Sequence, residues 1–200
     1  LARADGRVLL VAMAERLPAA AAARLGAVID RGELQLERDG LAQRWPARFG
    51  VVALDEGRDD DERVPPALAE RLGIWLDLGE VGHRDADEGI ALGAHEIAAA
   101  RALWPRVRVA DAVVAALCEA AVALGVASLR APIFALAAAR LHAALAGRDE
   151  IDADDVRAAA RLVLAPRATR LPATEDAEPV QEPPAESAVE PAAEPAAEPA

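Results

Sequence analysis

The basic side chains of this sequence allow one kind of phosphate chemistry and exclude another. All 22 basic residues are arginine, and the sequence contains no lysine. The phosphate-binding loop that places an invariant lysine on the β- and γ-phosphates is therefore absent from this sequence. An arginine guanidinium can still contact phosphate oxygens in a bidentate manner, because its N–H donors form a planar fork. Any contact with phosphate is expected to come from arginine.

The other reactive side chains give no pattern of a catalytic or metal site. His83, His95 and His142 lack the His-x-x-x-His or carboxylate spacing of metal ligands, so they are interpreted as surface or boundary residues. Cys118 is the single cysteine, which excludes a disulfide framework, and its apolar helical surroundings predict a buried thiol. The acidic run at residues 59–62 could attract Mg²⁺, but a solvated loop is the favoured interpretation.

Charge and hydropathy exclude two classes of partner. The net charge is −12, and the segment after Arg170 contributes eight acids and no base, which leaves −4 for the rest. Because no basic stripe stands out, binding to nucleic acid is disfavoured. No uncharged apolar run approaches the roughly 18 residues of a membrane span. The apolar run at residues 8–14 is too short for a signal peptide and ends at Glu15 and Arg16.

The first part of the chain has the pattern of an α/β layer. Residues 8–12 and 49–54 are short continuous apolar runs, typical of strands covered on both faces, and residues 74–78 form a third such run. An Ala-rich helix is predicted over residues 19–30. Residues 33–38 and 41–45 alternate around Asp-Gly, which predicts a hairpin with a type I′ turn.

The second part of the chain has the pattern of three short amphipathic helices. Asp111 is predicted to cap the first, and Ser128 the second, which runs from about residue 129 to residue 146 and stops at Gly147. Asp152 is predicted to start the third, with Asp155 in the position of a capping box. The expected apolar positions of the first and third helices are Val114, Leu117, Ala121 and Leu124, then Val156, Ala159, Leu162 and Val163.

The predicted domain division follows these patterns. Residues 1–80 form the α/β part, 81–108 a connector, 109–168 the helical part, and 169–200 a disordered acidic tail rich in Pro and Ala. The tail cannot bury enough apolar surface to offset its chain entropy, so an extended linker is expected. Its abrupt end at Ala200 predicts a further domain beyond it.

Three stretches of sequence carry a resemblance to a known family. Residues 1–17 read Leu-Ala-Arg-Ala-Asp-Gly-Arg-Val-Leu-Leu-Val-Ala-Met-Ala-Glu-Arg-Leu, residues 36–40 read Leu-Glu-Arg-Asp-Gly, and residues 46–49 read Pro-Ala-Arg-Phe. They resemble the AAA+ subunits of magnesium chelatase, and Ala-Met-Ala-Glu-Arg-Leu resembles the D subunit rather than the I subunit. The resemblance covers about residues 1–170.

This resemblance implies an incomplete AAA+ fold. The expected architecture is a P-loop NTPase-like parallel sheet with an inserted β-hairpin, a three-helix lid and the disordered tail. The family's strand order implies that a central strand, from a segment absent here, separates residues 49–54 from residues 74–78. The sheet would then have a gap and exposed apolar edges.

The resemblance also implies that this subunit has lost its own hydrolytic residues. In active members the first strand ends in Asp-Glu, which hold Mg²⁺ and polarise water, whereas Ala12 and Met13 stand at these degenerate Walker B positions. Neither side chain can coordinate a hard cation or accept a proton. The second strand should end near a polar residue, usually Asn, but Asp55 or Glu56 is present and would repel a triphosphate.

Two arginines match functional positions of the family. Arg71, in Pro66-Ala67-Leu68-Ala69-Glu70-Arg71-Leu72, aligns with the arginine finger that reaches a neighbouring subunit's ATP, and Arg130 aligns with the lid's sensor arginine. The plainer alternatives remain open. Arg71 could be a surface residue paired with Glu70 or Asp77, and Arg130 could be solvated at a helix N-terminus.

The function that the resemblance implies is that of a non-hydrolysing subunit. It would assemble with the ATPase I subunit and help couple ATP hydrolysis to Mg²⁺ insertion into protoporphyrin IX, which a large porphyrin-binding subunit performs. ATP and Mg²⁺ would act at the level of the complex, with none bound by this fragment, and a cytoplasmic location is expected. The alternatives are an active AAA+ ATPase of another metal-insertion or chaperone type, and a helical interaction module.

Overall fold

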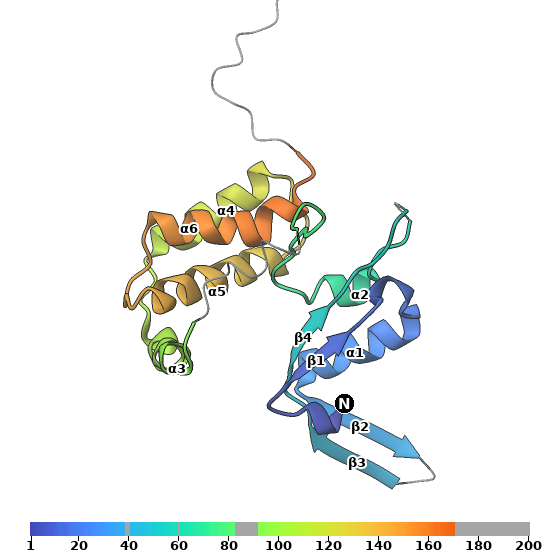
Figure 1. The fold of residues 1–200 in the computed structure, drawn as a ribbon. Coiled ribbons are helices and arrows are strands. Elements are labelled where there is room, and N and C mark those ends of the chain that lie inside the picture. The colour runs from blue at the N-terminus through green and yellow to red at the C-terminus, as the bar shows by residue number, and fades with distance from the viewer. Residues whose placement is uncertain (39–40, 60, 83–91, 171–200) are drawn as a thin grey trace, which may run out of the picture.

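The chain folds into an α/β part and a helical part that lie side by side (Figure 1). The computed structural model describes residues 1–38, 41–59, 61–82 and 92–170. The expected α/β class, with a parallel sheet followed by helices, is confirmed. The predicted tail lies outside the described residues, apart from residues 169–170, and the predicted domain boundaries remain a prediction.

A pair of parallel strands forms the centre of the α/β part. β1 (Val8–Val11) pairs with β4 (Gly50–Ala53), with Val8 opposite Gly50 and Val11 opposite Ala53. Helix α1 (Ala19–Arg31) covers one face, because Leu9 and Val11 pack against its buried residues. Alternate strand residues point to opposite faces, so Val8 and Leu10 lie on the other face, where both are exposed. Within the described part of the chain, this second face has no cover.

Local sequence explains the path from α1 into the hairpin. Pro18 precedes the helix and Gly32 ends it with φ of +69°, a conformation that glycine adopts without a Cβ penalty. β2 (Glu33–Arg38) and β3 (Leu41–Pro46) then pair in the antiparallel direction from Glu33 opposite Pro46. The predicted hairpin is confirmed, and its Asp39-Gly40 turn lies outside the described residues.

The third predicted strand is not formed. Residues 74–78 belong to no strand of the described chain, and Ile74, Leu76 and Leu78 are exposed. The N–H of Trp75 donates instead to the carbonyl of Leu162 in the helical part, at 3.4 Å. A strand needs a neighbour for its backbone groups, and this segment has none among the described residues. The expected strand is therefore replaced by an irregular segment that contacts the helices.

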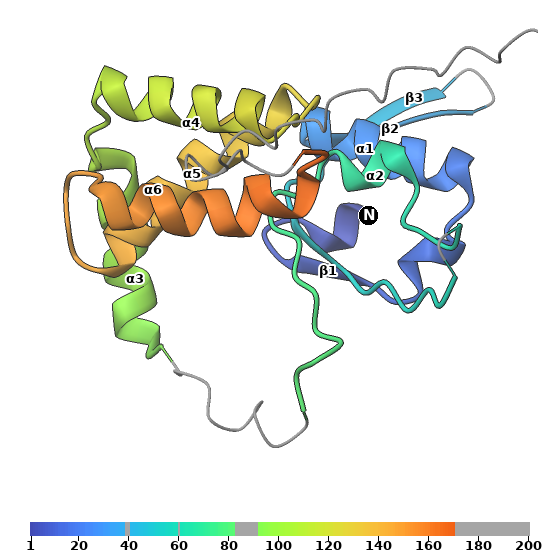
Figure 2. The same cartoon turned by 90° about the horizontal axis from the view of Figure 1, so that it is seen from above.

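The helical part contains one helix more than predicted. α3 (Ala94–Leu103), α4 (Asp111–Ala123), α5 (Arg130–Leu145) and α6 (Ala153–Ala159) pack around one core, and Figure 2 shows α4, α5 and α6 running alongside one another. α6 continues into a π-helical turn (Ala160–Leu164) and a final 3₁₀ turn (Ala165–Arg167). α3 lies in the predicted connector but contacts α5.

Small side chains let these helices approach closely. α5 buries an alanine completely at every fourth position, which places these residues on one face of the helix. The buried set is Ala131, Ala135, Ala139 and Ala143. None of the described helices is long and apolar enough to cross a membrane.

Two details of α4 correct the sequence-based expectations. Asp111 is the first helical residue and Ala110 precedes it as a cap without a side-chain hydrogen bond, so the predicted Asp111 cap is wrong.

Cys118 is exposed rather than buried. α4 buries Leu117 and Ala121, which share one face, and a residue one position after Leu117 is turned about 100° away from that face. Cys118 therefore lies on the outward side of α4, although its neighbours in the sequence are apolar.

The cap predicted for the third helix is present, whereas the second helix, α5, is preceded by Leu129 without a side-chain cap, so the predicted Ser128 cap is wrong. Ser128 Oγ accepts a hydrogen bond from the N–H of Arg130 at 3.3 Å, at the start of α5. Asp152 and Asp155 form a capping box: the Asp152 side chain accepts from the N–H of Asp155 at 3.0 Å, and Asp155 Oδ2 accepts from the N–H of Asp152 at 2.8 Å. These reciprocal bonds satisfy donors that a helix N-terminus would otherwise leave free.

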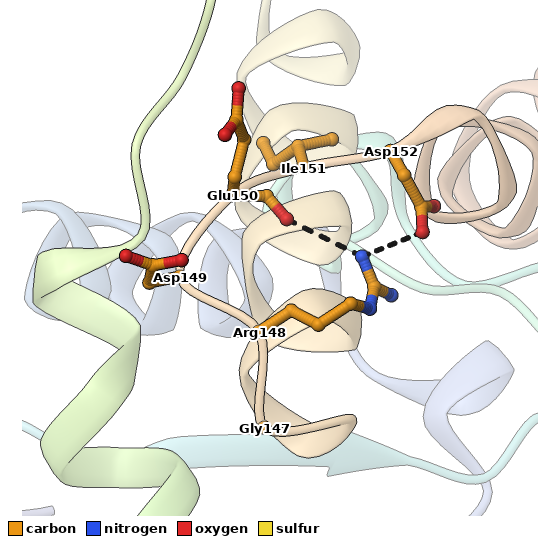
Figure 3. A pocket seen from close by; sticks show the side chains of 6 residues that line it. All are labelled: Gly147, Arg148, Asp149, Glu150, Ile151 and Asp152. Carbon is orange, nitrogen blue, oxygen red and sulfur yellow. Dashed lines mark hydrogen bonds and ion pairs between the residues drawn. The ribbon is translucent and has the colours of Figure 1, made fainter.

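The loop between α5 and α6 is held by a buried carboxylate. Asp155 is fully buried and accepts from Arg148 Nη2 at 2.6 Å and from His142 Nδ1 at 2.5 Å. Arg148 also reaches Asp152 and the carbonyl of Glu150, which closes the loop around its guanidinium (Figure 3). Burial alone raises the pKa of Asp155, but the bonds from Arg148, the Asp152 N–H and His142 outweigh it and hold this pKa well below its ordinary value.

Candidate functional site

Arg71 follows the short helix α2 and lies against α1. α2 (Pro66–Ala69) packs on α1, with Leu68 fully buried between them. The Arg71 side chain then crosses α1 at Gly26, where a Cβ would stand only 2.9 Å from Arg71 Nε. Nη1 donates to the carbonyl of Ala67 at 2.5 Å, which holds the near side of the guanidinium. The absence of a side chain at Gly26 therefore provides the space that Arg71 occupies.

Asp30 brings the two predicted arginines together. Arg71 donates to Asp30 Oδ2 from Nη2 at 2.5 Å and from Nε at 3.1 Å. Arg130, from the first turn of α5, donates to Oδ1 at 3.2 Å and to Oδ2 at 3.3 Å. One carboxylate on α1 thus binds two guanidinium groups that are 59 positions apart in sequence. The pKa of Asp30 is lowered, chiefly by its hydrogen bond with Arg71, with burial opposing and Arg130 adding to the effect.

A second polar contact joins the same two parts of the chain. Ser128 donates from Oγ to Glu70 Oε2 at 2.5 Å, directly beside the Asp30 pair. A pocket opens between these two contacts, at the junction of the α/β part and the helical part. Its lining residues are Glu70, Arg71, Ala127, Ser128, Leu129 and Arg130. This pocket is the candidate functional site, since it collects both arginines that the sequence singled out.

The structure shows which partners the two arginines have, and these differ from the partners suggested by sequence spacing. Arg71 pairs with Asp30 and not with Glu70, which binds Ser128, or with Asp77, whose Oδ1 accepts from the N–H of Gly79. The Arg71 side chain is only 20% exposed, whereas that of Arg130 is 46% exposed. Both groups are held by the fold and still border solvent. Such an arrangement can present fixed N–H donors to an anion.

The end of β1 offers no metal ligand and no base. Ala12 and Met13 follow the strand, and Met13 has φ of +48° and is exposed. Glu15 is the nearest carboxylate in sequence, but its side chain is only 2% exposed and accepts from the N–H of Glu56 at 3.0 Å. It therefore ties the ends of β1 and β4 together. Mg²⁺ needs several oxygen ligands, and these residues do not fit a magnesium nucleotide.

The carboxylates near β4 are likewise engaged in local structure. Asp55 accepts from the N–H of Gly57 at 3.0 Å and from that of Val64 at 3.4 Å, so it closes the loop before α2. Glu62 accepts from the N–H of Arg58 within the same loop. In the described ranges no three His, Cys, Asp or Glu residues are grouped as a metal site. Among the histidines, His95 is exposed, and His83 lies outside the described residues.

Sequence reasoning missed the residue that organises this pocket. The sequence places Asp30 only at the end of a predicted helix. A carboxylate in the last turn of a helix is unfavourable, because the C-terminal end of the helix dipole is negative. That misplaced charge was a signal that Asp30 has a cationic partner elsewhere. Which partner it has depends on long-range packing, and no local spacing relates residue 30 to residues 71 and 130.

The fold of this chain matches a known family model and a solved structure. Residues 114–187 match the family model of the AAA lid domain. The structure is similar to a crystal structure of a proposed ATPase from Cytophaga hutchinsonii, with a TM-score of 0.57 and 18% identity over 80% of this chain and 58% of the other. At that identity the likeness concerns the fold alone. The chain therefore carries an AAA+ fold with its lid.

The chain is also similar in sequence to curated magnesium-chelatase subunits. The chain is 41% identical to the magnesium-chelatase 60 kDa subunit of Cereibacter sphaeroides over 88% of its own length and 28% of the relative. It is 38% identical to the 60 kDa subunit of Rhodobacter capsulatus over 86% of this chain and 28% of that relative. It is 30% identical to the 67 kDa subunit of Chlorobaculum parvum over 89% of this chain and 31% of that relative. The resemblance to magnesium chelatase is confirmed, and the chain spans about three tenths of these relatives.

Proposed function

We propose that this chain is part of a non-hydrolysing AAA+ subunit of magnesium chelatase. It presents Arg71 and Arg130 across a subunit interface to ATP held by the ATPase I subunit. In doing so it helps to couple ATP hydrolysis to the insertion of Mg²⁺ into protoporphyrin IX. The complex is an ATP-dependent ligase that forms nitrogen–metal bonds, and the large porphyrin-binding subunit carries out the insertion step.

The observation that carries this proposal is the shared Asp30 carboxylate. A single acceptor bound by both Arg71 and Arg130 requires their guanidinium groups to converge within hydrogen-bonding reach of one point. A phosphate oxygen has the charge and the acceptor geometry of a carboxylate oxygen, so a γ-phosphate fits the same donors. Both arginines would then serve one nucleotide, and it would belong to a neighbour, because this chain's own β1 end lacks hydrolytic residues.

The chemistry of the site supports a role in stabilising charge. Guanidinium groups placed on the γ-phosphoryl stabilise the charge that develops as the phosphoryl group transfers. Ala12 and Met13 have no titratable group, so activation of water in cis has no candidate at that position. ATP and Mg²⁺ accordingly act at the level of the complex. A cytoplasmic location and the absence of nucleic-acid binding are part of the same proposal.

The proposal is tested by removing each guanidinium from the full-length subunit that contains this sequence. After reconstitution with the ATPase I subunit, Arg71→Ala is expected to lower ATP turnover by about 10³-fold or more, since arginine fingers contribute about 10³–10⁵ to kcat. Arg130→Ala should lower it by a smaller factor. Arg71→Lys should not restore turnover, because lysine lacks the planar fork. Turnover and affinity for the I subunit are measured together.

Arg24 on the exposed side of α1 supplies the matched control. Arg24→Ala removes the same kind of charge from α1, the helix against which Arg71 lies, and should leave turnover unchanged. Unchanged turnover in Arg71→Ala, with normal assembly, would refute the role of Arg71 in trans. A loss of equal size in Arg24→Ala would show that net charge, and not the pocket, is responsible.

The two alternative functions predict different outcomes. An active AAA+ ATPase of another metal-insertion or chaperone type would hydrolyse ATP without the I subunit, so an ATPase assay of the full-length protein alone decides this point. A helical interaction module would associate with an ATPase subunit to the same extent with and without ATP. Sedimentation under both conditions separates that module from the proposed subunit.

A further inference from the structure

Arg167 connects the end of the lid to the backbone that follows Arg71. It belongs to the final turn of the helical part, and its side chain crosses to the segment after α2. Nη1 donates to the carbonyls of Val163 at 2.7 Å and Gly73 at 3.1 Å, and Nη2 donates to the carbonyl of Leu72. One planar group thus joins the lid to the residues that come directly after Arg71 in the chain.

An aromatic ring and a second lid residue complete this connection. The guanidinium carbon of Arg167 lies 4.1 Å from the centre of the Trp75 ring, a cation–π contact. Trp75 Nε1 donates to the carbonyl of Leu72 at 3.1 Å, so the ring and Arg167 share that acceptor. Phe134 of α5 packs against Gly73, where a Cβ would stand 3.5 Å from the Phe134 ring.

The environment of Arg167 favours a fixed geometry. All of its hydrogen-bond acceptors in the described chain are backbone carbonyls, which cannot rotate away as a carboxylate side chain can. Burial lowers the pKa of Arg167, with the charge of Glu70 opposing this effect. A partly buried guanidinium bound to three carbonyls has few alternative positions, since leaving them would strand donors away from water.

We infer that Arg167 is a positioning residue through which the lid sets the orientation of Arg71. Arg71 is held on α1 by Asp30 and the Ala67 carbonyl. The next two residues in the chain, Leu72 and Gly73, are held by the lid through Arg167. A movement of the lid therefore pulls on the backbone next to Arg71. This inference rests on the proposed action of Arg71 on a neighbour's nucleotide and adds a route for its control.

The test compares Arg167→Lys with Arg161→Lys in the full-length subunit reconstituted with the I subunit. Lysine keeps the charge but cannot serve carbonyls of two segments with a planar fork. Arg167→Lys is expected to lower kcat for ATP about tenfold to a hundredfold, as misplacement of a catalytic group by about 1 Å does, with KM and subunit affinity unchanged within about twofold. Arg161 is exposed in the same turn region, and its replacement should change none of these quantities.

A double-mutant cycle separates positioning from simple stabilisation. In an Arg71→Ala background, Arg167→Lys should cause no further loss of kcat, because the group that it positions is gone. Hydrogen exchange at the amides of residues 72–75 should accelerate in Arg167→Lys and not in Arg161→Lys. An equal loss of kcat in both backgrounds would overturn the inference, as would a loss confined to subunit affinity.

A second variant covers the case in which Arg167→Lys does not fold. Trp75→Leu removes the ring beneath the guanidinium and the donor to Leu72, while the carbonyl acceptors remain. It should reduce kcat in the same Arg71-dependent way, by a smaller factor, and an effect independent of Arg71 would overturn the inference. If Arg71→Ala itself has no effect, the proposed function fails. If Arg71→Ala acts and neither Arg167→Lys nor Trp75→Leu does, only this inference fails.

Discussion

At the scale of single residues, the pocket depends on one residue that is small and one that is charged. Gly26 and Asp30 are four positions apart and therefore lie on the same face of α1. Gly26 leaves space for the Arg71 side chain to lie across the helix, and Asp30 binds its far end. Neither residue is chemically reactive in this position. Their contribution is to fix where the guanidinium groups stand.

Gly26→Ala provides a test in which stability and activity should change in opposite directions. Alanine in a helix interior is favoured over glycine by about 1 kcal/mol, so α1 should become no less stable. The added Cβ would stand 2.9 Å from Arg71 Nε, so the side chain of Arg71 must shift. ATP turnover in the reconstituted complex is expected to fall about tenfold. Thermal unfolding and turnover are measured on the same preparation.

Ala23→Gly is the corresponding control on the exposed side of α1. It should lower the free energy of unfolding by about 1 kcal/mol and leave turnover unchanged. Normal turnover in Gly26→Ala would mean that Arg71 does not need its observed path across α1.

At the scale of elements, the lid is stabilised by the loop between α5 and α6, which is held by the buried carboxylate of Asp155. Asp155 has no exposure, and Arg148 and His142 reach it from the loop and from α5. Replacing one partner of such a buried pair leaves the other charge without compensation, which costs more than the pair contributes. The α5–α6 connection should therefore be the acid-sensitive point of the helical part.

The lowered pKa of Asp155 gives the direction of this pH dependence. A carboxyl whose pKa is lower in the folded state stabilises the fold above its unfolded pKa, near 4, and this contribution is lost as pH falls through the folded pKa. Asp155→Asn is expected to lower the free energy of unfolding by about 3 kcal/mol at pH 7. The difference between the two proteins should shrink as pH falls below about 4.

Urea denaturation between pH 7 and pH 3 measures this difference, and Asp154→Asn is the control. Asp154 is exposed and pairs with the exposed Arg157, so its replacement should have little effect at any pH. A constant difference between wild type and Asp155→Asn over the whole range would contradict the role of ionised Asp155.

At the scale of the whole molecule, much of the apolar surface lacks a partner. Val8 and Leu10 on the open face of the strand pair are 66% and 61% exposed, and Leu76 and Leu78, in the segment that forms no strand in the described chain, are also exposed. Single exposed aliphatic residues are ordinary in proteins, but a group on one sheet face usually marks an interface. The chain spans about three tenths of its curated relatives, and this face is accessible in the chain.

The 200-residue chain alone is therefore expected to self-associate through its open sheet face. Replacing Val8 and Leu10 together by threonine should weaken the association constant about tenfold or more, since each aliphatic side chain contributes about 1.5 kcal/mol when buried. Sedimentation velocity over a concentration series measures the change. Val122→Thr removes a similarly exposed aliphatic residue from α4 and should leave association unaffected. Equal effects of both changes would indicate nonspecific association.

The parts of this molecule that the sequence predicted are those set by local chemistry. Gly32 ends α1 and the Asp152 and Asp155 pair starts α6, because caps depend on residues a few positions apart. The AAA+ architecture followed from a resemblance, and the structure and the lid match confirm it. Residues 74–78 were predicted as a strand from their apolar alternation. Pairing decides whether such a run becomes a strand, and in the described chain Trp75 binds the lid instead.

The remaining misses have the same physical origin. Cys118 is exposed because the face that α4 buries depends on where α5 lies, which no pattern within α4 determines. Asp30 and Arg167 act over separations of 41 and 94 residues, so their roles emerge only when the lid is placed against the α/β part. The candidate site was thus predicted by its arginines and not by the residues that hold them.

The Asp30 carboxylate also determines which anions the pocket should discriminate against. Two guanidinium groups bind Asp30, and the Glu70 carboxylate also lines the pocket, so the pocket is close to electrically neutral before any ligand arrives. Free phosphate would experience no net electrostatic attraction to the pocket, and it would have to compete with Asp30 for the two arginines. A triphosphate carried by a docked neighbour arrives at an effective concentration of the order of millimolar. We therefore expect the pocket to select a triphosphate because a docked subunit holds it nearby, and inorganic phosphate and other free polyanions should compete poorly.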